Sequence, residues 1–358
     1  MTRNVEDNFR RQYEIVINVY IAGTLCVLGI AGNLLSIVVL GRDSTIRRTT
    51  GFLLQMLAVA DVSFLVSCFF FQTFLTVEKW TDWLPAVVSR QWPYVEFCTW
   101  PTASLTQTAT VWLVVLLTVD RYIAICHPLH AVQYSTMPRL RRAVAVVWLL
   151  AIVYNLPRFF ERVVTEDASA NSKLSNSSLQ LVTTAETAVE HRRAVLMKTS
   201  LRNDVYFVVY KLCSYFVFRF LFPFAALVFF NQRLIRTVRQ SNRFRQNNAT
   251  EGGRERRNTW TVVVLVIVFL LCSLPSVAIR TCYILFLYVP DYVPFSKRFL
   301  IYTNEWSNLM LTVNSSINVV IYCFMGRQFR DAVLRVISRR DGGQSGRETG
   351  SGETRSRT

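Results

Sequence analysis

The sequence has few histidines and no pair of cysteines at metal-binding spacing. It contains 3 histidines, and none of its 8 cysteines belongs to a Cys-x-x-Cys motif. Structural zinc and iron–sulfur sites need such clusters. Most of the cysteines lie inside apolar runs, where a buried thiol usually packs as a small hydrophobic group. No nucleophile–base arrangement is evident either, so we expect no metal site and no enzymatic activity.

Acidic residues are also scarce. The chain has 23 Asp and Glu against 40 Lys and Arg, which gives a net charge of +17. Such an excess can indicate nucleic-acid binding, but here the arginines cluster between apolar runs, and 52% of the residues are hydrophobic. Basic loops between apolar segments are typical of membrane proteins. We therefore expect a multi-pass membrane protein with no nucleic-acid partner.

Long apolar segments recur along the chain. A membrane helix needs about 20 apolar residues to cross about 30 Å of hydrocarbon, and the segments that reach or approach this length lie at 13–40, 51–77, 96–126, 142–160, 205–232, 259–287 and 299–324. The last segment is the most polar, so hydropathy alone would miss it. The pattern predicts an all-α fold, with a seven-helix transmembrane domain over residues 13–325.

The distribution of Lys and Arg predicts the orientation. The loops after the first, third and fifth segments are rich in Arg, whereas the short loops of the opposite face are not. Basic loops favour the cytoplasmic side. Residues 1–12 are polar, and the apolar run after them is too long for a signal peptide. We expect residues 1–12 to form an extracellular tail at the plasma membrane.

The C-terminal region changes composition twice. Over residues 326–338, apolar side chains such as Phe329 and Val333 recur at helical spacing, with arginines on the other face. This pattern is typical of an amphipathic helix that lies on anionic membrane lipid. Residues 339–358 are rich in Gly, Ser, Thr and Arg, and we expect them to form a disordered cytoplasmic tail.

Charged residues inside the apolar segments need a partner or a function. Asp61 lies in the middle of the second segment. Asp120 and Arg121 end the third segment, followed by Tyr122. Adjacent helix residues point about 100° apart, so both charges cannot face lipid. The pair either marks the membrane boundary or has a function.

These residues carry a family resemblance. The sequence around Asp120 reads TVDRYIAICHPL and resembles the third helix and second intracellular loop of rhodopsin-family G-protein-coupled receptors. The LAVAD ending at Asp61 and the NVVIY of the seventh segment resemble two further motifs of that family, although Val319 replaces the proline of the second. Ser273 also stands where most members have Trp. The resemblance implies a receptor that activates a heterotrimeric G protein, with receptor kinases and arrestin as further partners.

The resemblance also implies two groups of functional residues. The first is the switch for G-protein coupling, with Asp120, Arg121, Tyr122, Glu255, Asn318 and Tyr322. Glu255 is either an acid that holds Arg121 or a solvated residue of its loop. The second is a polar cluster that in the family binds an allosteric sodium ion, with Asn33, Asp61, Thr110, Asn314 and Asn318. The alternative is a hydrogen-bond network that only joins helices.

Two covalent modifications follow from the resemblance and the orientation. In the family, a cysteine at the place of Cys98 forms a disulfide to the second extracellular loop. Segment 158–212 contains no Cys, which leaves Cys213 as the expected partner and Cys282 as an alternative. Asn176 begins an Asn-Ser-Ser glycosylation motif on the side expected to be extracellular.

The outer ends of the helices suggest a peptide ligand. Ala103 stands where amine receptors of the family carry Asp, and the seventh segment has no Lys after Lys297 for a retinal Schiff base. The charged residues of the candidate pocket are Glu96, Arg219, Arg280 and Glu305. Their alternative roles are helix capping and snorkelling.

A closer resemblance points to one class of peptide. The segments YVEFCTWPTASL, NLPRFFE and NSSINVVIYCFMGRQFR resemble invertebrate FMRFamide-type neuropeptide receptors. This implies an amidated peptide whose Arg pairs with Glu305 or Glu96. The alternative is a receptor for a non-peptide ligand, such as a lipid or another small molecule. A transporter or channel would need internal repeats or a polar path, and the sequence has neither.

We predict that the two ligand classes respond differently to Glu305→Gln and Arg280→Ala. Peptide agonism should collapse in both variants, because a charged ligand group loses its partner, whereas a lipid agonist would tolerate them. Dose–response curves of the activating ligand on both variants give the answer. Unchanged potency would favour the non-peptide receptor.

Overall fold

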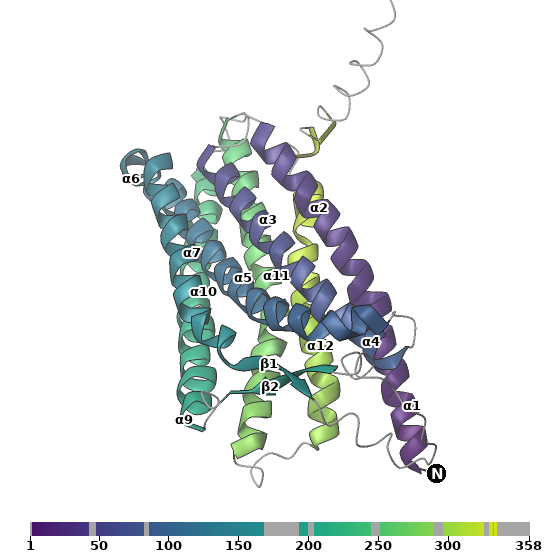
Figure 1. Cartoon of the computed structure of the whole chain (residues 1–358). Coiled ribbons are helices and arrows are strands. Elements are labelled where there is room, and N and C mark those ends of the chain that lie inside the picture. The colour runs from purple at the N-terminus through teal and green to yellow at the C-terminus, as the bar shows by residue number, and fades with distance from the viewer. Residues whose placement is uncertain are drawn as a thin grey trace, which may run out of the picture.

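The computed structural model describes a bundle of long helices (Figure 1). The described residues are 2–42, 48–81, 86–167, 193–199, 204–244, 251–288, 296–325, 329–331 and 333–334. The helical bounds agree with the seven predicted segments to within a few residues at most ends. The predicted tail over 339–358 and most of the predicted helix over 326–338 lie outside the described residues.

The first two membrane segments each contain a π-helical stretch. The first consists of α1 (Thr2–Glu14), η1 (Ile15–Ala22) and α2 (Gly23–Arg42), and the second of α3 (Arg48–Cys68), η2 (Phe69–Phe74) and α4 (Leu75–Trp80). Residues 2–14, which include most of the predicted N-terminal tail, are helical. Residues 2–14 contain no Gly or Pro, and Arg10 Nε donates to Glu14 Oε1 at 2.7 Å, four residues away. Both features favour a helix.

The middle segments form one long helix and its neighbours. The third segment is α5 (Ala86–Cys126), and it is followed by the short α6 (Pro128–Tyr134). The fourth is α7 (Met137–Phe159). The fifth consists of α9 (Asp204–Tyr206), η5 (Phe207–Leu221) and α10 (Phe222–Phe244).

The last two segments are α11 (Glu251–Tyr288), and α12 (Lys297–Ser316) with α13 (Asn318–Met325). The seventh segment is interrupted at Ile317 although Val319 replaces the proline of the family motif. The amide of Ile317 still donates to the carbonyl of Val313 at 2.9 Å. The interruption therefore occurs without a proline and without loss of this helical hydrogen bond.

A small sheet was not predicted. Strands β1 (Arg162–Asp167) and β2 (Arg193–Lys198) form an antiparallel pair, with Arg162 opposite Lys198. The β-branched residues of RVVTED favour a strand. The sheet lies across the end of the bundle that also carries the N-terminus (Figure 1). We call this the hairpin end, and the other, which carries α6, the α6 end.

The surface of the bundle suits lipid. Leu149, Leu150 and Val153 of α7 are 59–61% exposed. Apolar surface of this extent is unfavourable in water but not in hydrocarbon. Among the described residues, six helices are long and apolar enough to cross a membrane. The α12 helix is not one of them, as the polar sequence of the seventh segment predicted.

Two glycines allow the first and seventh segments to approach closely. A Cβ atom at Gly32 would lie 2.5 Å from Cγ1 of Val319. A Cβ atom at Gly29 would overlap Oγ of Ser316 and would lie 2.8 Å from Cδ1 of Leu65. Small residues at such contacts are typical of packed membrane helices.

We predict that Gly32→Ala lowers the stability of the protein, although alanine is the better helix former. The added methyl group must displace Val319, and overpacking costs about 1–3 kcal/mol. Thermal unfolding in detergent would measure the change. Gly41→Ala is the matched control, because a Cβ atom there meets only the flexible end of Gln55. Equal unfolding temperatures for the two variants would contradict the prediction.

Candidate functional site

The predicted charge pair lies inside the protein at the α6 end. Arg121 Nη2 donates to Asp120 Oδ2 at 2.6 Å, and Arg121 Nε donates to the same oxygen at 3.2 Å. The hydroxyl of Ser135 donates to Asp120 Oδ1. Both members of the pair are buried. Asp120 therefore holds Arg121, and Ser135, just after α6, holds Asp120.

Two other predicted switch residues, Tyr122 and Tyr322, make contacts of their own. The hydroxyl of Tyr122 is 3.1 Å from Nε2 of His127, within hydrogen-bond distance. Tyr322 is buried, and its ring centroid is 5.6 Å from that of Phe329. Its hydroxyl has no hydrogen-bond partner among the described residues. The side chain of Glu255 lies outside the described residues.

The polar cluster forms around Asp61, which is fully buried. Asn318 Nδ2 donates to Asp61 Oδ2 at 2.6 Å, and the Thr110 hydroxyl lies 3.5 Å from Asp61 Oδ1. Asn33 Nδ2 donates to the carbonyls of Gly29 and Ser315 at 2.8 and 2.9 Å. These contacts join the first, second, third and seventh segments.

One predicted member of the cluster takes a lesser part. Asn314 is buried, but within the described part of the chain no hydrogen bond joins it to Asp61. Asn318, one turn further along, takes that place.

A cavity lies in the half of the bundle nearer the hairpin end, with ≈ 420 Å³ of empty space that includes space open to solvent. Its walls are aromatic and apolar side chains, neutral polar side chains and one arginine. The lining residues are Phe64, Cys68, Phe71, Gln72, Trp100, Ala103, Ser104, Gln107, Arg158, Asn308 and Leu311. None of these described lining residues is acidic. Arg158 would repel a cationic group that entered this cavity.

Of the predicted pocket residues, Arg219 does not line the cavity but donates hydrogen bonds to two side chains that do. It is buried, and it donates to Ser104 Oγ at 3.1 Å and to Gln107 Oε1. Its guanidinium also lies 5.3 Å from the ring centroid of Tyr215. Arg219 therefore fixes two lining side chains instead of lining the cavity itself.

The predicted acids lie outside the cavity lining. Glu96 accepts a hydrogen bond from Arg162 of β1 at 2.5 Å, which ties α5 to the hairpin. Glu305 is half-buried and interacts with Asn18 of the first segment. The side chain of Arg280 lies outside the described residues.

Sequence reasoning missed Arg158 and Gln72 as lining residues. Arg158 is 7% exposed, and its guanidinium lies 5.7 Å from the ring centroid of Tyr210. The signal was available for Gln72, which interrupts the aromatic run CFFFQTFL. A polar residue in such a run needs an internal partner.

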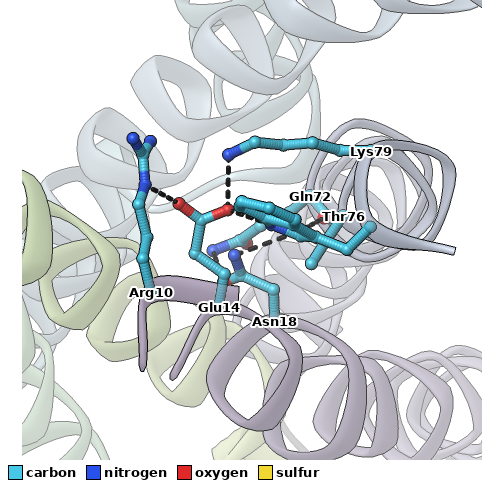
Figure 2. A network of polar contacts seen from close by, with 7 residues as sticks. Arg10, Glu14, Asn18, Gln72, Thr76 and Lys79 are labelled. Carbon is cyan, nitrogen blue, oxygen red and sulfur yellow. Dashed lines mark hydrogen bonds and ion pairs between the residues drawn. The ribbon is translucent and has the colours of Figure 1, made fainter. Parts of the chain in front are cut away.

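Sequence reasoning also missed a buried carboxylate at the hairpin end. Glu14 is 6% exposed and accepts three hydrogen bonds (Figure 2). The donors are Arg10 Nε at 2.7 Å, Lys79 Nζ at 2.6 Å and Trp80 Nε1 at 2.6 Å. Glu14 therefore joins the first segment to the outer end of the second.

Asn18, one turn from Glu14, continues this network towards the cavity. Its Nδ2 donates to Thr76 Oγ1 at 3.2 Å, and its Oδ1 accepts from Gln72 Nε2 at 3.2 Å (Figure 2). Its backbone carbonyl accepts from the Thr73 hydroxyl at 2.8 Å. The network thus reaches the cavity wall at Gln72.

The structure does not contain the disulfide that the resemblance implied. Cys98 and Cys213 are both free and exposed. Cys98 lies on α5 and Cys213 on the outer surface of η5, so neither thiol is turned towards the interior. The alternative, Cys282, is also free. The glycosylation motif at Asn176 lies outside the described residues.

We predict that Glu14→Gln lowers the free energy of unfolding by about 1–3 kcal/mol, because the two cations then share a neutral acceptor. The matched control is Glu6→Gln, since Glu6 forms an exposed ion pair with Arg298 at 2.7 Å. Exposed pairs contribute about 0–1 kcal/mol. Thermal unfolding of both variants would measure the difference. A larger loss at Glu6 than at Glu14 would refute the prediction.

Comparison with known families gives one match over most of the chain. Residues 32–322 match the family described as 7 transmembrane receptor (rhodopsin family). This range includes the Asp61 cluster, the cavity and the Asp120–Arg121 pair.

Individual relatives are peptide receptors by name. The chain is 25% identical to the FMRFamide receptor of Drosophila melanogaster over 315 residues, which is 88% of the chain and 52% of the relative. It is 30% identical to the Sex peptide receptor of the same fly over 245 residues, 65% of the chain and 52% of the relative. The FMRFamide peptide receptor frpr-18 of Caenorhabditis elegans is 25% identical over 318 residues, 87% of the chain and 67% of the relative. The chain spans about half the length of the two fly proteins.

Proposed function

Because the chain belongs to the rhodopsin family of seven-transmembrane receptors, we propose that it is a G-protein-coupled receptor for an extracellular peptide. The observation that carries this proposal is the cavity in the hairpin half of the bundle, at the opposite end from the buried Asp120–Arg121 pair. The receptor lies in the plasma membrane with its N-terminus outside. It speeds nucleotide exchange on its G protein and performs no covalent chemistry itself.

The ligand that fits best is an amidated, FMRFamide-like peptide. Relatives named for FMRFamide support this class. The cavity walls support it too, because Phe71 and Trp100 suit an aromatic ligand side chain and the neutral polar residues suit an uncharged terminus. The arginine of such a peptide pairs with Glu305, near the hairpin end. Glu96 is the weaker candidate, because Arg162 already neutralises it.

Ligand binding acts on the G protein through a change of conformation. A ligand shifts an equilibrium only by binding one state more tightly than the other. The favoured state is one in which α11 moves outward and opens a cytoplasmic cavity around Arg121 for the C-terminal helix of a Gα subunit. In the present arrangement Asp120 and Ser135 hold Arg121 in place. Receptor kinases, arrestin and membrane lipid are further partners on this face.

The Asp61 cluster is the proposed site of an allosteric sodium ion. Hard cations prefer oxygen ligands, and the cluster offers the Asp61 carboxylate and the Thr110 hydroxyl. The Oδ1 atom of Asn33 is buried without a partner among the described residues. The residues present therefore fit a small cation.

We predict a nanomolar response to an amidated invertebrate neuropeptide in transfected cells. Calcium and cAMP signalling would be measured across a library of such peptides, with surface expression confirmed. Arg121→Ala is the control, because it should abolish coupling while leaving ligand binding intact. If no peptide of the library gives a calcium or cAMP response, the result would contradict a peptide ligand and favour a non-peptide one. A response that survives in the Arg121→Ala variant would exclude the proposed coupling mechanism.

A further inference from the structure

Gln72 connects the cavity to the polar network of the first segment, and the donors and acceptors of that network fix its orientation. The Thr76 hydroxyl donates to the Gln72 carbonyl at 2.7 Å, so Thr76 Oγ1 acts as the acceptor for Asn18 Nδ2 at 3.2 Å. Asn18 then presents its Oδ1 to Gln72. An amide oxygen can only accept, so Gln72 must present its Nε2, at 3.2 Å (Figure 2).

In this orientation the Oε1 atom of Gln72 is left without a hydrogen-bond donor. Gln72 is 5% exposed and lines the cavity, and its Oε1 has no hydrogen-bond partner among the described residues. A buried acceptor without a donor costs free energy, which a ligand that donates a hydrogen bond would recover. Because Oε1 is shielded from water, the ligand must displace a neighbouring side chain to reach it.

The second polar atom without a partner in the cavity wall is a donor. Arg158 is 7% exposed and lines the cavity, and its Nε has no partner among the described residues. Arg158 Nε is as shielded as Gln72 Oε1. Once neighbouring side chains move, the two residues would offer one unused acceptor and one unused donor, which suits a group with both capacities. A primary carboxamide has N–H donors and a carbonyl acceptor.

The two common alternatives fit less well. An ammonium or guanidinium group would donate to Gln72, but it would meet Arg158 where none of the described lining residues is acidic. A buried charge without a partner is unfavourable. A carboxylate would pair with Arg158, but it has no hydrogen to donate. Its oxygen would face the Oε1 atom of Gln72, and two acceptors repel each other.

We propose that the relay of Thr76, Asn18 and Gln72 makes the cavity selective for a primary carboxamide over a carboxylate. Asn18 does not line the cavity. It is a positioning residue, which sets the selectivity by holding Gln72 with its oxygen free. The proposal rests on the proposed peptide-receptor function and assigns the amidated terminus of the ligand to Gln72 and Arg158.

The test uses the full chain in lipid nanodiscs and two small probes that differ only at the terminus. These are N-acetylphenylalaninamide and N-acetylphenylalanine, titrated by ligand-observed NMR. We expect the amide to bind at least about tenfold more tightly, the ratio that a single hydrogen bond supplies. Gln72→Met should remove the preference by weakening the amide alone.

The Asn18→Leu variant distinguishes positioning from a general loss of structure. Without Asn18, the Gln72 amide is free to turn its Nε2 towards the ligand. We expect the acid probe to gain affinity while the amide loses it, and a merely damaged site would not gain. Thr76→Val should shift the ratio in the same direction if Asn18→Leu does not fold. The matched control is Thr73→Val, which removes only the bond to the Asn18 backbone and should leave the ratio unchanged.

Equal affinity for both probes, a preference for the acid, or binding of neither at millimolar concentration would overturn the proposal. So would an amide preference that survives both Gln72→Met and Asn18→Leu. Binding of the probes is measured without any signalling step. Failure of this proposal can therefore be distinguished from failure of the peptide-library experiment. A silent library with Gln72-dependent amide binding would refute the peptide agonist alone. A nanomolar peptide whose amide and acid forms are equally potent would refute the relay alone.

Discussion

A polar group inside the hydrocarbon of a membrane has no water to bond, so it must find its partner within the protein. Three buried polar sites among the described residues satisfy that constraint. Asp61 takes a hydrogen bond from Asn318, Arg121 pairs with Asp120, and Arg219 donates to Ser104 and Gln107. Each bond except the one between Asp120 and Arg121 also joins two segments distant in sequence, so satisfying the polar groups and packing the helices are the same event.

Where a polar atom lacks a partner, the constraint has a functional meaning. The unpaired Oε1 of Gln72 and Nε of Arg158 belong to two residues that line the same cavity, and both atoms are themselves buried. A membrane protein that leaves such atoms unpaired loses stability, and a ligand that pairs them binds more tightly for the same reason. Under the proposed recognition of a carboxamide, the ligand would recover the free energy that these two atoms cost the empty protein.

The sequence predicted the membrane segments well, because span length and the placement of Arg follow directly from the thickness and charge of a bilayer. The contact between Asp61 and Asn318 was also predictable, since a buried acid needs a donor. The orientation of the Gln72 amide could not be predicted from the sequence. It depends on the Asn18 side chain, whose Nδ2 donates to Thr76 and whose Oδ1 is therefore the atom that faces Gln72. Glu14 was missed because it is next to a polar stretch that was taken for a tail, whereas the helix carries it into a set of donors.

The seventh segment connects the cavity to the Asp61 cluster. Asn308 of α12 lines the cavity, and Asn318, the first residue of α13, donates to Asp61. The interruption at Ile317 lies between them. Gly29 and Gly32 hold the first segment against the residues on either side of this interruption, Ser316 and Val319. The chain has lost the family's proline, yet the seventh segment is still interrupted at Ile317, between the two residues that approach these glycines.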